Sequence, residues 1–220
     1  APMEIVLVSL LGGLLALDAT SVGQFMASRP LVAGAITGWA VGEPAAGVAV
    51  GAILELYLLV SYPTGGSRFP EGSTATVVAV AAAGTGSAGA LALAVAAGLV
   101  WGQLAGASIT YLRRANARLV PDPGQGPTAT RRLPAGHLAA VLLDFVRGVV
   151  VTFAGVLVAR PLVDGLVASW PVPPDATFAL LLVGGSVSVG ILLRDLGGFR
   201  RHRTAFVLGL ALALLGAGLL

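Results

Sequence analysis

The sequence predicts an all-α polytopic membrane protein with several transmembrane helices and short re-entrant or broken helices. Three observations predict this class. Hydrophobic residues make up 56% of the 220-residue chain, and only 10% of the residues are charged. The mean hydropathy is +0.92. Apolar blocks separated by proline, glycine or charged residues recur along the whole chain. A soluble globular domain is excluded, because its surface would carry about 25% charged residues.

Five long apolar blocks are predicted to lie in the bilayer. The first, residues 3–17, has no basic segment before it, so we interpret it as a membrane segment and not as a cleaved secretory signal. Later blocks are long enough to cross about 30 Å of hydrocarbon, and Thr204 begins the last predicted span. These later blocks are residues 88–111, 138–159, 178–193 and 204–220.

Two further blocks are too short to span at about 1.5 Å per residue. Residues 31–41 end at Gly42-Glu43-Pro44, and residues 74–83 end at Gly84-Thr85-Gly86-Ser87. Half-length apolar segments broken by glycine or proline are typical of re-entrant helices around a transport site. Irregular backbone is tolerated at that depth only beside protein or a water-filled cavity. The sequence therefore predicts such a cavity in the N-terminal half.

The net charge of +3 comes from two arginine clusters, within residues 113–132 and 194–203. The positive-inside rule predicts that both are cytoplasmic, with two crossings between them and the C-terminus outside. The topology of the N-terminal half is left open. We expect one membrane-embedded domain over residues 1–220, with an N-terminal half (1–112), a cytoplasmic loop (113–136) and a C-terminal half (137–220). No nucleic-acid partner is expected.

Glu55 is the strongest candidate for a functional residue. It lies ten residues into the apolar block of residues 45–60. A bare carboxylate at that depth costs about 2.5–3.5 kcal/mol, so Glu55 should face a cavity or a partner. One interpretation is an acceptor for substrate hydroxyls, with Tyr57 and Tyr62 nearby. The alternative is a structural carboxylate that is paired with an arginine or is protonated.

The other acids and the glycines have structural interpretations. Asp144 and Arg147 are three residues apart on one helix face, and we expect a structural ion pair. Asp18 and Glu71 lie beside turns, where a solvated or capping acid is the usual role. Glycines spaced by four residues predict close helix contacts; they are Gly34, Gly38 and Gly42, Gly47 and Gly51, and Gly98, Gly102 and Gly106. No catalytic set, metal site or cofactor is expected, and the absence of cysteine excludes thiolate chemistry.

Residues 16–83 carry a pattern that resembles the IIC subunit of the mannose/fructose/sorbose family of the sugar phosphotransferase system. Its elements follow one another in the family's order: Asp18, then Arg29-Pro30-Leu31, then Gly38-x-x-x-Gly42-Glu43, then Gly47-x-x-x-Gly51 leading to Leu54-Glu55, then Phe69-Pro70-Glu71-Gly72. Residues 137–158 are similar to a later helix of the family, with Arg147 at its arginine.

The resemblance implies a sugar permease subunit without a catalytic residue of its own. It implies a hexose-type substrate, a IID membrane subunit, cytoplasmic IIA and IIB phosphocarriers, a homo-oligomer and the bacterial cytoplasmic (inner) membrane. Carried over by position, Glu55 and the Pro70-Glu71 turn fall in the substrate-holding core, and Asp18 precedes the first re-entrant piece. The predicted substrate-binding residues are therefore Asp18, Glu55, Tyr57, Tyr62 and Glu71. The family's members are generally longer, with the difference mainly in the C-terminal part. A non-transporting relative that acts as a membrane scaffold or sensor is therefore the alternative.

Overall fold

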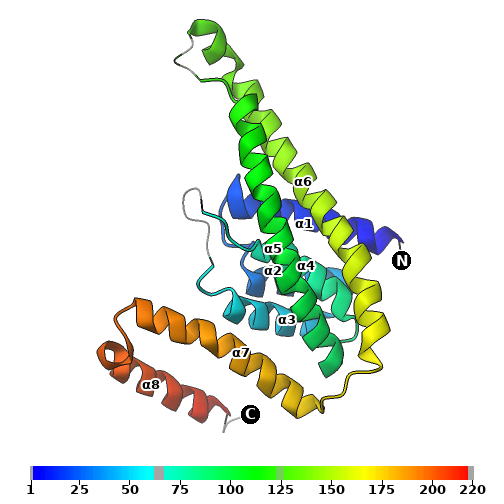
Figure 1. Ribbon diagram of the computed structural model, residues 1–220, viewed down its shortest axis with the longest axis vertical. Helices are drawn as coiled ribbons and strands as arrows, with labels where there is room; N and C mark the ends of the chain where they lie inside the picture. The colour runs from blue at the N-terminus through cyan, green and yellow to red at the C-terminus, as the bar shows by residue number, and fades with distance from the viewer. Residues whose placement is uncertain (1, 62–66, 123, 125, 218–220) are drawn as a thin grey trace.

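The structure is a computed structural model that describes residues 2–61, 67–122, 124 and 126–217. It confirms the all-α class, since the described residues form eight helices and no strand (Figure 1). The helices are α1 (Pro2–Thr20), α2 (Pro30–Val41), α3 (Pro44–Tyr57), α4 (Gly72–Ala83), α5 (Ala88–Leu119), α6 (Pro127–Val167), α7 (Pro174–Asp195) and α8 (Phe199–Ala217).

Four helices in the described part of the chain are long and apolar enough to cross a membrane, namely α1, α5, α6 and α7. The predicted last span, residues 204–220, is not among them. Helix α8 already begins at Phe199 and takes in Arg200, Arg201 and Arg203, with a kink at His202, where the backbone leaves helical geometry. These charges leave the described part of α8 too short in apolar residues for a full crossing, and residues 218–220 lie outside it.

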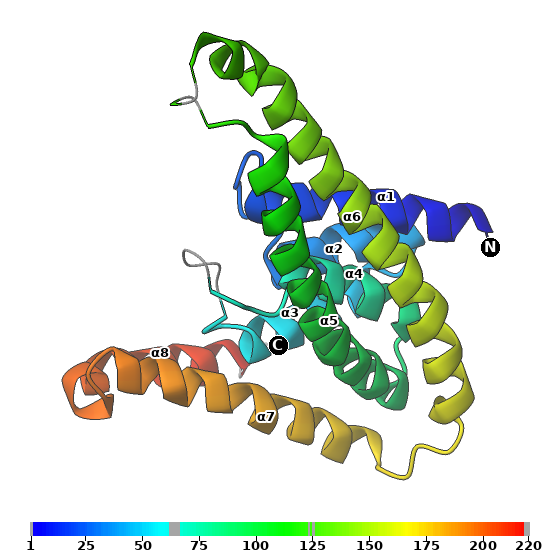
Figure 2. The same ribbon diagram turned by 45° about the horizontal axis from the view of Figure 1, so that its top comes forward.

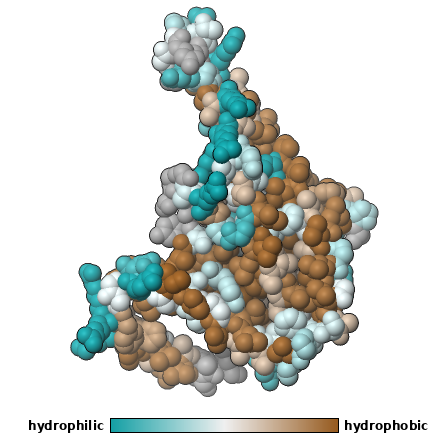
Figure 3. Space-filling model, in the orientation of Figure 1, coloured by the Kyte–Doolittle hydropathy of each residue, from teal (hydrophilic) through white to brown (hydrophobic). Residues whose placement is uncertain are grey.

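The segment expected as a loop, residues 113–136, is mostly helical. Helix α5 continues to Leu119 and α6 already begins at Pro127. Arginine, alanine and leucine favour helix, and proline is well tolerated in the first turn. The two helices project together beyond the rest of the molecule (Figures 1 and 2), and their projecting end carries a hydrophilic surface (Figure 3). Similarly, α6 continues through Pro161 to Val167, where a return region was expected from residue 160.

The predicted half-length helices are confirmed. Helices α2 and α4 have 12 residues each, or about 18 Å, well short of the hydrocarbon thickness. Helix α4 lies at the centre of the molecule, in contact with α1, α2, α3, α5 and α6 (Figure 2). Every residue from Ser73 to Ala83 is buried, so no face of α4 is left for lipid. A turn with positive φ at Gly84 and Gly86 separates it from α5.

Glycines hold α2 and α3 together as a tight hairpin. Gly42 ends α2 in the left-handed conformation (φ 83°), and Pro44 opens α3. A Cβ atom on Gly34 would lie 2.5 Å from the carbonyl oxygen of Gly47, and one on Gly38 would lie 2.7 Å from the Cα of Gly47. The two backbones therefore touch directly, as the glycine spacing predicted, while Gly42 serves the turn.

The C-terminal hairpin of α7 and α8 extends away from this core (Figures 1 and 2). Helix α7 packs on α3 and α5, whereas α8 packs on α7 alone among the described helices. Large apolar side chains on the hairpin are exposed, including Leu182 at 53%, Val187 at 62% and Leu208 at 64%. Such a surface suits lipid or a second membrane protein.

The α2–α3 contact makes a stability prediction. A Cβ at position 47 would overlap backbone atoms of Gly34 and Gly38, which cannot rotate away. Gly47→Ala should therefore lower stability by about 1–3 kcal/mol, seen as a lower thermal midpoint of the detergent-purified protein.

Gly165→Ala on α6 is the matched control, because a Cβ there meets no atom within 4 Å. It should be neutral or stabilising by up to about 1 kcal/mol. Equal effects of the two substitutions would contradict the direct backbone contact.

Candidate functional site

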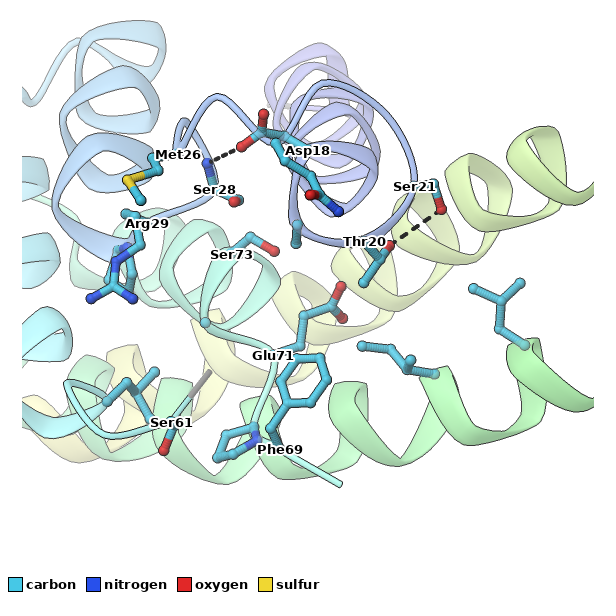
Figure 4. Close-up of a pocket in the computed structure, with 18 of the residues that line it drawn as sticks. Asp18, Thr20, Ser21, Met26, Ser28, Arg29, Ser61, Phe69, Glu71 and Ser73 are labelled. Carbon is cyan, nitrogen blue, oxygen red and sulfur yellow. Dashed lines mark hydrogen bonds between the residues drawn. The ribbon is translucent and has the colours of Figure 1, made fainter. Parts of the chain in front are cut away.

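A cavity of about 620 Å³ lies where the C-terminal end of α1 meets the N-terminal ends of α2 and α4 (Figure 4). Helix α5 and the residues after α3 complete its walls. Helix N-termini carry partial positive charge and unpaired N–H groups, so this arrangement suits a polar ligand. The lining residues are Asp18, Ala19, Thr20, Ser21, Gln24, Met26, Ser28, Arg29, Pro30, Leu58, Ser61, Phe69, Pro70, Glu71, Gly72, Ser73, Ile109, Leu112, Arg113 and Asn116.

Asp18 shapes the wall between α1 and α2. Its carboxylate is buried and accepts hydrogen bonds from the backbone N–H groups of Phe25 (2.7 Å) and Ser28 (2.8 Å). Figure 4 shows the bond from Ser28. These bonds fix a loop in which Gln24 and Met26 adopt positive φ (53° and 64°). Positive φ is unfavourable for such residues, so the loop depends on bonds of this kind.

Glu71, immediately before α4, is held by an arginine from α6. Its side chain is 1% exposed, and Arg147 approaches it with two parallel hydrogen bonds of 2.8 and 2.7 Å. Thr74 donates a further bond of 3.0 Å to the same carboxylate. Paired bonds between guanidinium and carboxylate combine charge with fixed geometry. The position of Glu71 is therefore set by α6 as well as by its own helix.

The same arginine holds Asp144, whose side chain is completely buried. Arg147 donates to Asp144 at 3.0 and 3.1 Å, and the Ser108 hydroxyl of α5 accepts from Arg147 at 3.0 Å. The hydroxyls of Thr20 and Ser21 donate to the second oxygen of Asp144. The expected Asp144–Arg147 contact is thus part of a larger network that joins α1, α4, α5 and α6.

The glycine stripe of α5 receives the segment that leads into α4. The Glu71 N–H donates to the carbonyl oxygen of Gly102 at 2.9 Å. A Cβ on Gly106 would overlap the carbonyl group of Phe69, and one on Gly98 would lie 2.9 Å from the Cβ of Ala79. Only glycine permits this approach, so the stripe positions one wall of the cavity.

Glu55 lies outside the cavity lining and acts on the N-terminal end of α2. Arg29, which does line the cavity, donates to Glu55, and the Leu31 N–H approaches the second carboxylate oxygen at 3.3 Å. The two side chains are 34% and 20% exposed. This contact matches the structural alternative for Glu55, a carboxylate paired with an arginine.

The tyrosines lie elsewhere. Tyr57 is not among the residues that line the cavity: its phenol packs against Gly184 of α7, and its carbonyl oxygen accepts a 2.9 Å hydrogen bond from Ser188. Glycine at position 184 leaves the space that the phenol fills. Tyr62 lies outside the described residues.

Two open polar groups mark the cavity. Among the described residues, Ser73 Oγ and Asn116 Oδ1 are buried atoms without a hydrogen-bond partner, and both residues line the cavity. Ser73 is 1% exposed, and its hydroxyl points into the space between Asp18 and Glu71 (Figure 4). Buried polar atoms are normally hydrogen-bonded, so these two groups are free to pair with a molecule bound in the cavity. No metal-binding group of three His, Asp or Glu side chains occurs in the described part of the chain.

Comparison with known protein families matches residues 2–217 to the sorbose-specific IIC component of the phosphotransferase system (PTS). The chain belongs to this family. The resemblance seen in residues 16–83 is thereby confirmed, and with it a membrane transport subunit of the PTS. No curated protein sequence matches the chain.

Two solved structures share the fold of this IIC component. One, described as a membrane protein, has a TM-score of 0.72 at 16% identity, over 100% of this chain and 94% of the other. The second is a complex of the mannose transporter ManYZ with microcin E492, with a TM-score of 0.52 at 17% identity, over 100% of this chain and 93% of the other.

The IIC component brings together some of its predicted site residues and separates others. Asp18 and Glu71 both line the cavity, although they come from segments more than fifty positions apart. Glu55 reaches the cavity through Arg29 only. The sequence did not predict Ser73 or Asn116 as site residues. Ser73 carries no charge that would distinguish it, and Asn116 falls in the segment expected to be an aqueous loop.

The buried network makes a second stability prediction. Arg147→Met would leave Glu71 and Asp144 buried without their cation, so stability should fall by about 3–5 kcal/mol. A thermal midpoint in detergent measures the loss, and adding Glu71→Gln should recover part of it, because one buried charge is then removed.

Arg160→Met on the same helix is the control. Arg160 pairs with Glu4 at 3.1 Å, but the side chains are 38% and 31% exposed. Its loss should cost about 0–1 kcal/mol. A midpoint for Arg147→Met no lower than that for Arg160→Met would show that the network is not essential.

Proposed function

We propose that this protein is the sugar-translocating IIC subunit of a PTS and that the cavity binds one hexose-type sugar. The observation that carries the proposal is the pair of unpartnered polar atoms, Ser73 Oγ and Asn116 Oδ1, on a cavity at the ends of broken helices. The volume of the cavity, about 620 Å³, lies within the range of roughly 300–1,000 Å³ that is common for small-molecule sites.

The chemistry of the lining favours a neutral, hydroxyl-rich ligand. Both acids at the cavity already accept bonds from the protein, Asp18 from backbone N–H groups and Glu71 from Arg147 and Thr74. The buried lining atoms left open are a hydroxyl and an amide oxygen, which pair with sugar hydroxyls. Arg29 supplies a further donor, while Phe69 and Leu112 offer apolar surface to the ring.

The direction of opening follows from the arginines. Arg113 and Asn116 line the cavity on the stretch of α5 that carries the first arginine cluster. By the positive-inside rule this end of the molecule is cytoplasmic. On this topology the sugar would leave the cavity on the cytoplasmic side, where a IIB phosphocarrier would meet it. The bacterial inner membrane is the location that the family implies.

A IID membrane subunit is the partner that the family implies. The exposed apolar side chains of α7 and α8 offer a surface for a membrane partner or for further copies of the chain.

Uptake and binding test the proposal separately. Phosphoenolpyruvate-dependent uptake of labelled mannose, fructose, sorbose and glucose would be measured in a strain that lacks other permeases and supplies IIA, IIB and IID. Binding of the same sugars to the purified chain is the second readout. Uptake supports the permease. Binding without uptake favours the alternative of a non-transporting sensor, and binding of none of these sugars contradicts both sugar-based proposals.

The open polar groups give the sharpest variants. Ser73→Ala and Asn116→Ala should each weaken sugar binding by about 2- to 12-fold, the equivalent of a lost hydrogen bond of about 0.5–1.5 kcal/mol. Thr152→Val is the matched control, because Thr152 Oγ1 is also buried and unpartnered but its residue does not line the cavity. An equal loss in all three variants would argue against direct contact with the sugar.

Glu55 is proposed to act by positioning Arg29. Glu55→Ala and Arg29→Ala should each weaken sugar binding by about 0.5–1.5 kcal/mol, and the double variant should be no weaker than the worse single variant. Unchanged binding in Glu55→Ala would remove Glu55 from the site, and additive losses would mean that the two residues act independently.

A further inference from the structure

A second recess lies beside α5 and shares no lining residue with the cavity described above. It measures about 100 Å³ and is lined by Arg68, Ala107, Thr110, Tyr111 and Arg114. Two arginines and a hydroxyl thus converge on a small hollow without an acidic lining residue. None of the ion pairs among the described residues involves Arg68 or Arg114.

Neighbouring contacts hold the guanidinium group of Arg114 and the backbone next to Arg68. Arg114 stacks over the ring of Tyr111, with 5.7 Å between its Cζ and the ring centroid. Arg113 turns the other way, stacks over Phe69 and donates a 2.9 Å hydrogen bond to the carbonyl oxygen of Ser67. The bond to Ser67 holds the neighbouring residue Arg68 against α5, so Arg68 and Arg114 both lie at the recess.

An apolar stripe leads directly to the recess along α5. Val100, Leu104, Ala107, Tyr111 and Arg114 follow at spacings of three or four residues and share one face of the helix. Val100 is 65% exposed, Leu104 56% and Tyr111 69%. Because α5 is long and apolar enough to cross the membrane, this stripe faces acyl chains, and Tyr111 marks the level of the headgroups.

We propose that the recess binds the phosphate of an anionic phospholipid, with its acyl chains along Val100 and Leu104. The positive charge fits the headgroup phosphate, and the stripe fits the chains; clustered basic residues at the cytoplasmic surface attract anionic lipids in this way. A soluble phosphate ion could use the arginines but not the stripe.

Bound lipid would bear on the neighbouring substrate cavity. Arg68 belongs to the segment that continues through Phe69 to Glu71, whereas Arg114 belongs to α5. One phosphate between them ties that segment to α5 and steadies the wall formed by Phe69, Pro70 and Glu71. The inference does not require that the cavity binds a sugar.

Native mass spectrometry of the full chain in detergent tests the lipid site. Phosphatidylglycerol and phosphatidylcholine with identical acyl chains would be titrated, and inorganic phosphate would be added as a competitor. The wild-type chain should retain phosphatidylglycerol in preference to phosphatidylcholine. The double variant Arg68→Ala/Arg114→Ala should weaken that binding about 30-fold, or about fivefold for each arginine.

Arg131→Ala/Arg132→Ala is the matched control, because it removes the same charge from exposed residues at the distal end of the projecting helices. It should leave phosphatidylglycerol binding within about twofold of wild type. Arg68→Lys/Arg114→Lys should bind phosphatidylglycerol more tightly than the Arg68→Ala/Arg114→Ala variant, since it keeps the charge. Equal losses in the two alanine pairs, no preference between the lipids, or displacement of the lipid by millimolar inorganic phosphate would each overturn the proposal.

Discussion

The pairing of Arg147 with two buried carboxylates is the interaction on which the arrangement of the core depends. Water cannot solvate these charges within the bilayer, so each must find its partner inside the protein. Arg147 comes from α6, Glu71 precedes α4, and Asp144 collects hydroxyl groups from the end of α1. The network therefore fixes where three segments meet, and the cavity opens at that meeting point.

Close contacts at glycine residues determine how the other helices pack. Among lipid tails, burial of apolar side chains gives little preference for one helix arrangement, so small residues that admit direct contact decide which helices pair. Glycines perform this role between α2 and α3, between α5 and the Phe69–Glu71 segment, and beneath Tyr57 at α7. In the first two places the glycines also position residues that line the cavity, Pro30 at the start of α2 and Phe69 to Glu71 before α4.

The polar groups around the cavity fall into two kinds. Some are hydrogen-bonded within the protein and hold its walls in place, and others have no partner within the protein. Asp18 and Glu71 are engaged with donors from the protein and hold backbone segments in place. Ser73 and Asn116 present unpaired atoms to the cavity. Both carboxylates of the lining are therefore engaged by donors from the protein, which is why the proposed ligand is a neutral one.

The sequence alone determined the membrane class, the broken helices and the family, because hydropathy, helix length and local motif order are properties of neighbouring residues. It also pointed to Asp18 and Glu71, which both line the cavity. Only the tertiary structure decided that Glu55 faces Arg29, that Tyr57 turns toward α7, and that Ser73 and Asn116 share one space. Those outcomes depend on which helices pack together, and no local pattern encodes the direction of a side chain across a contact between distant segments.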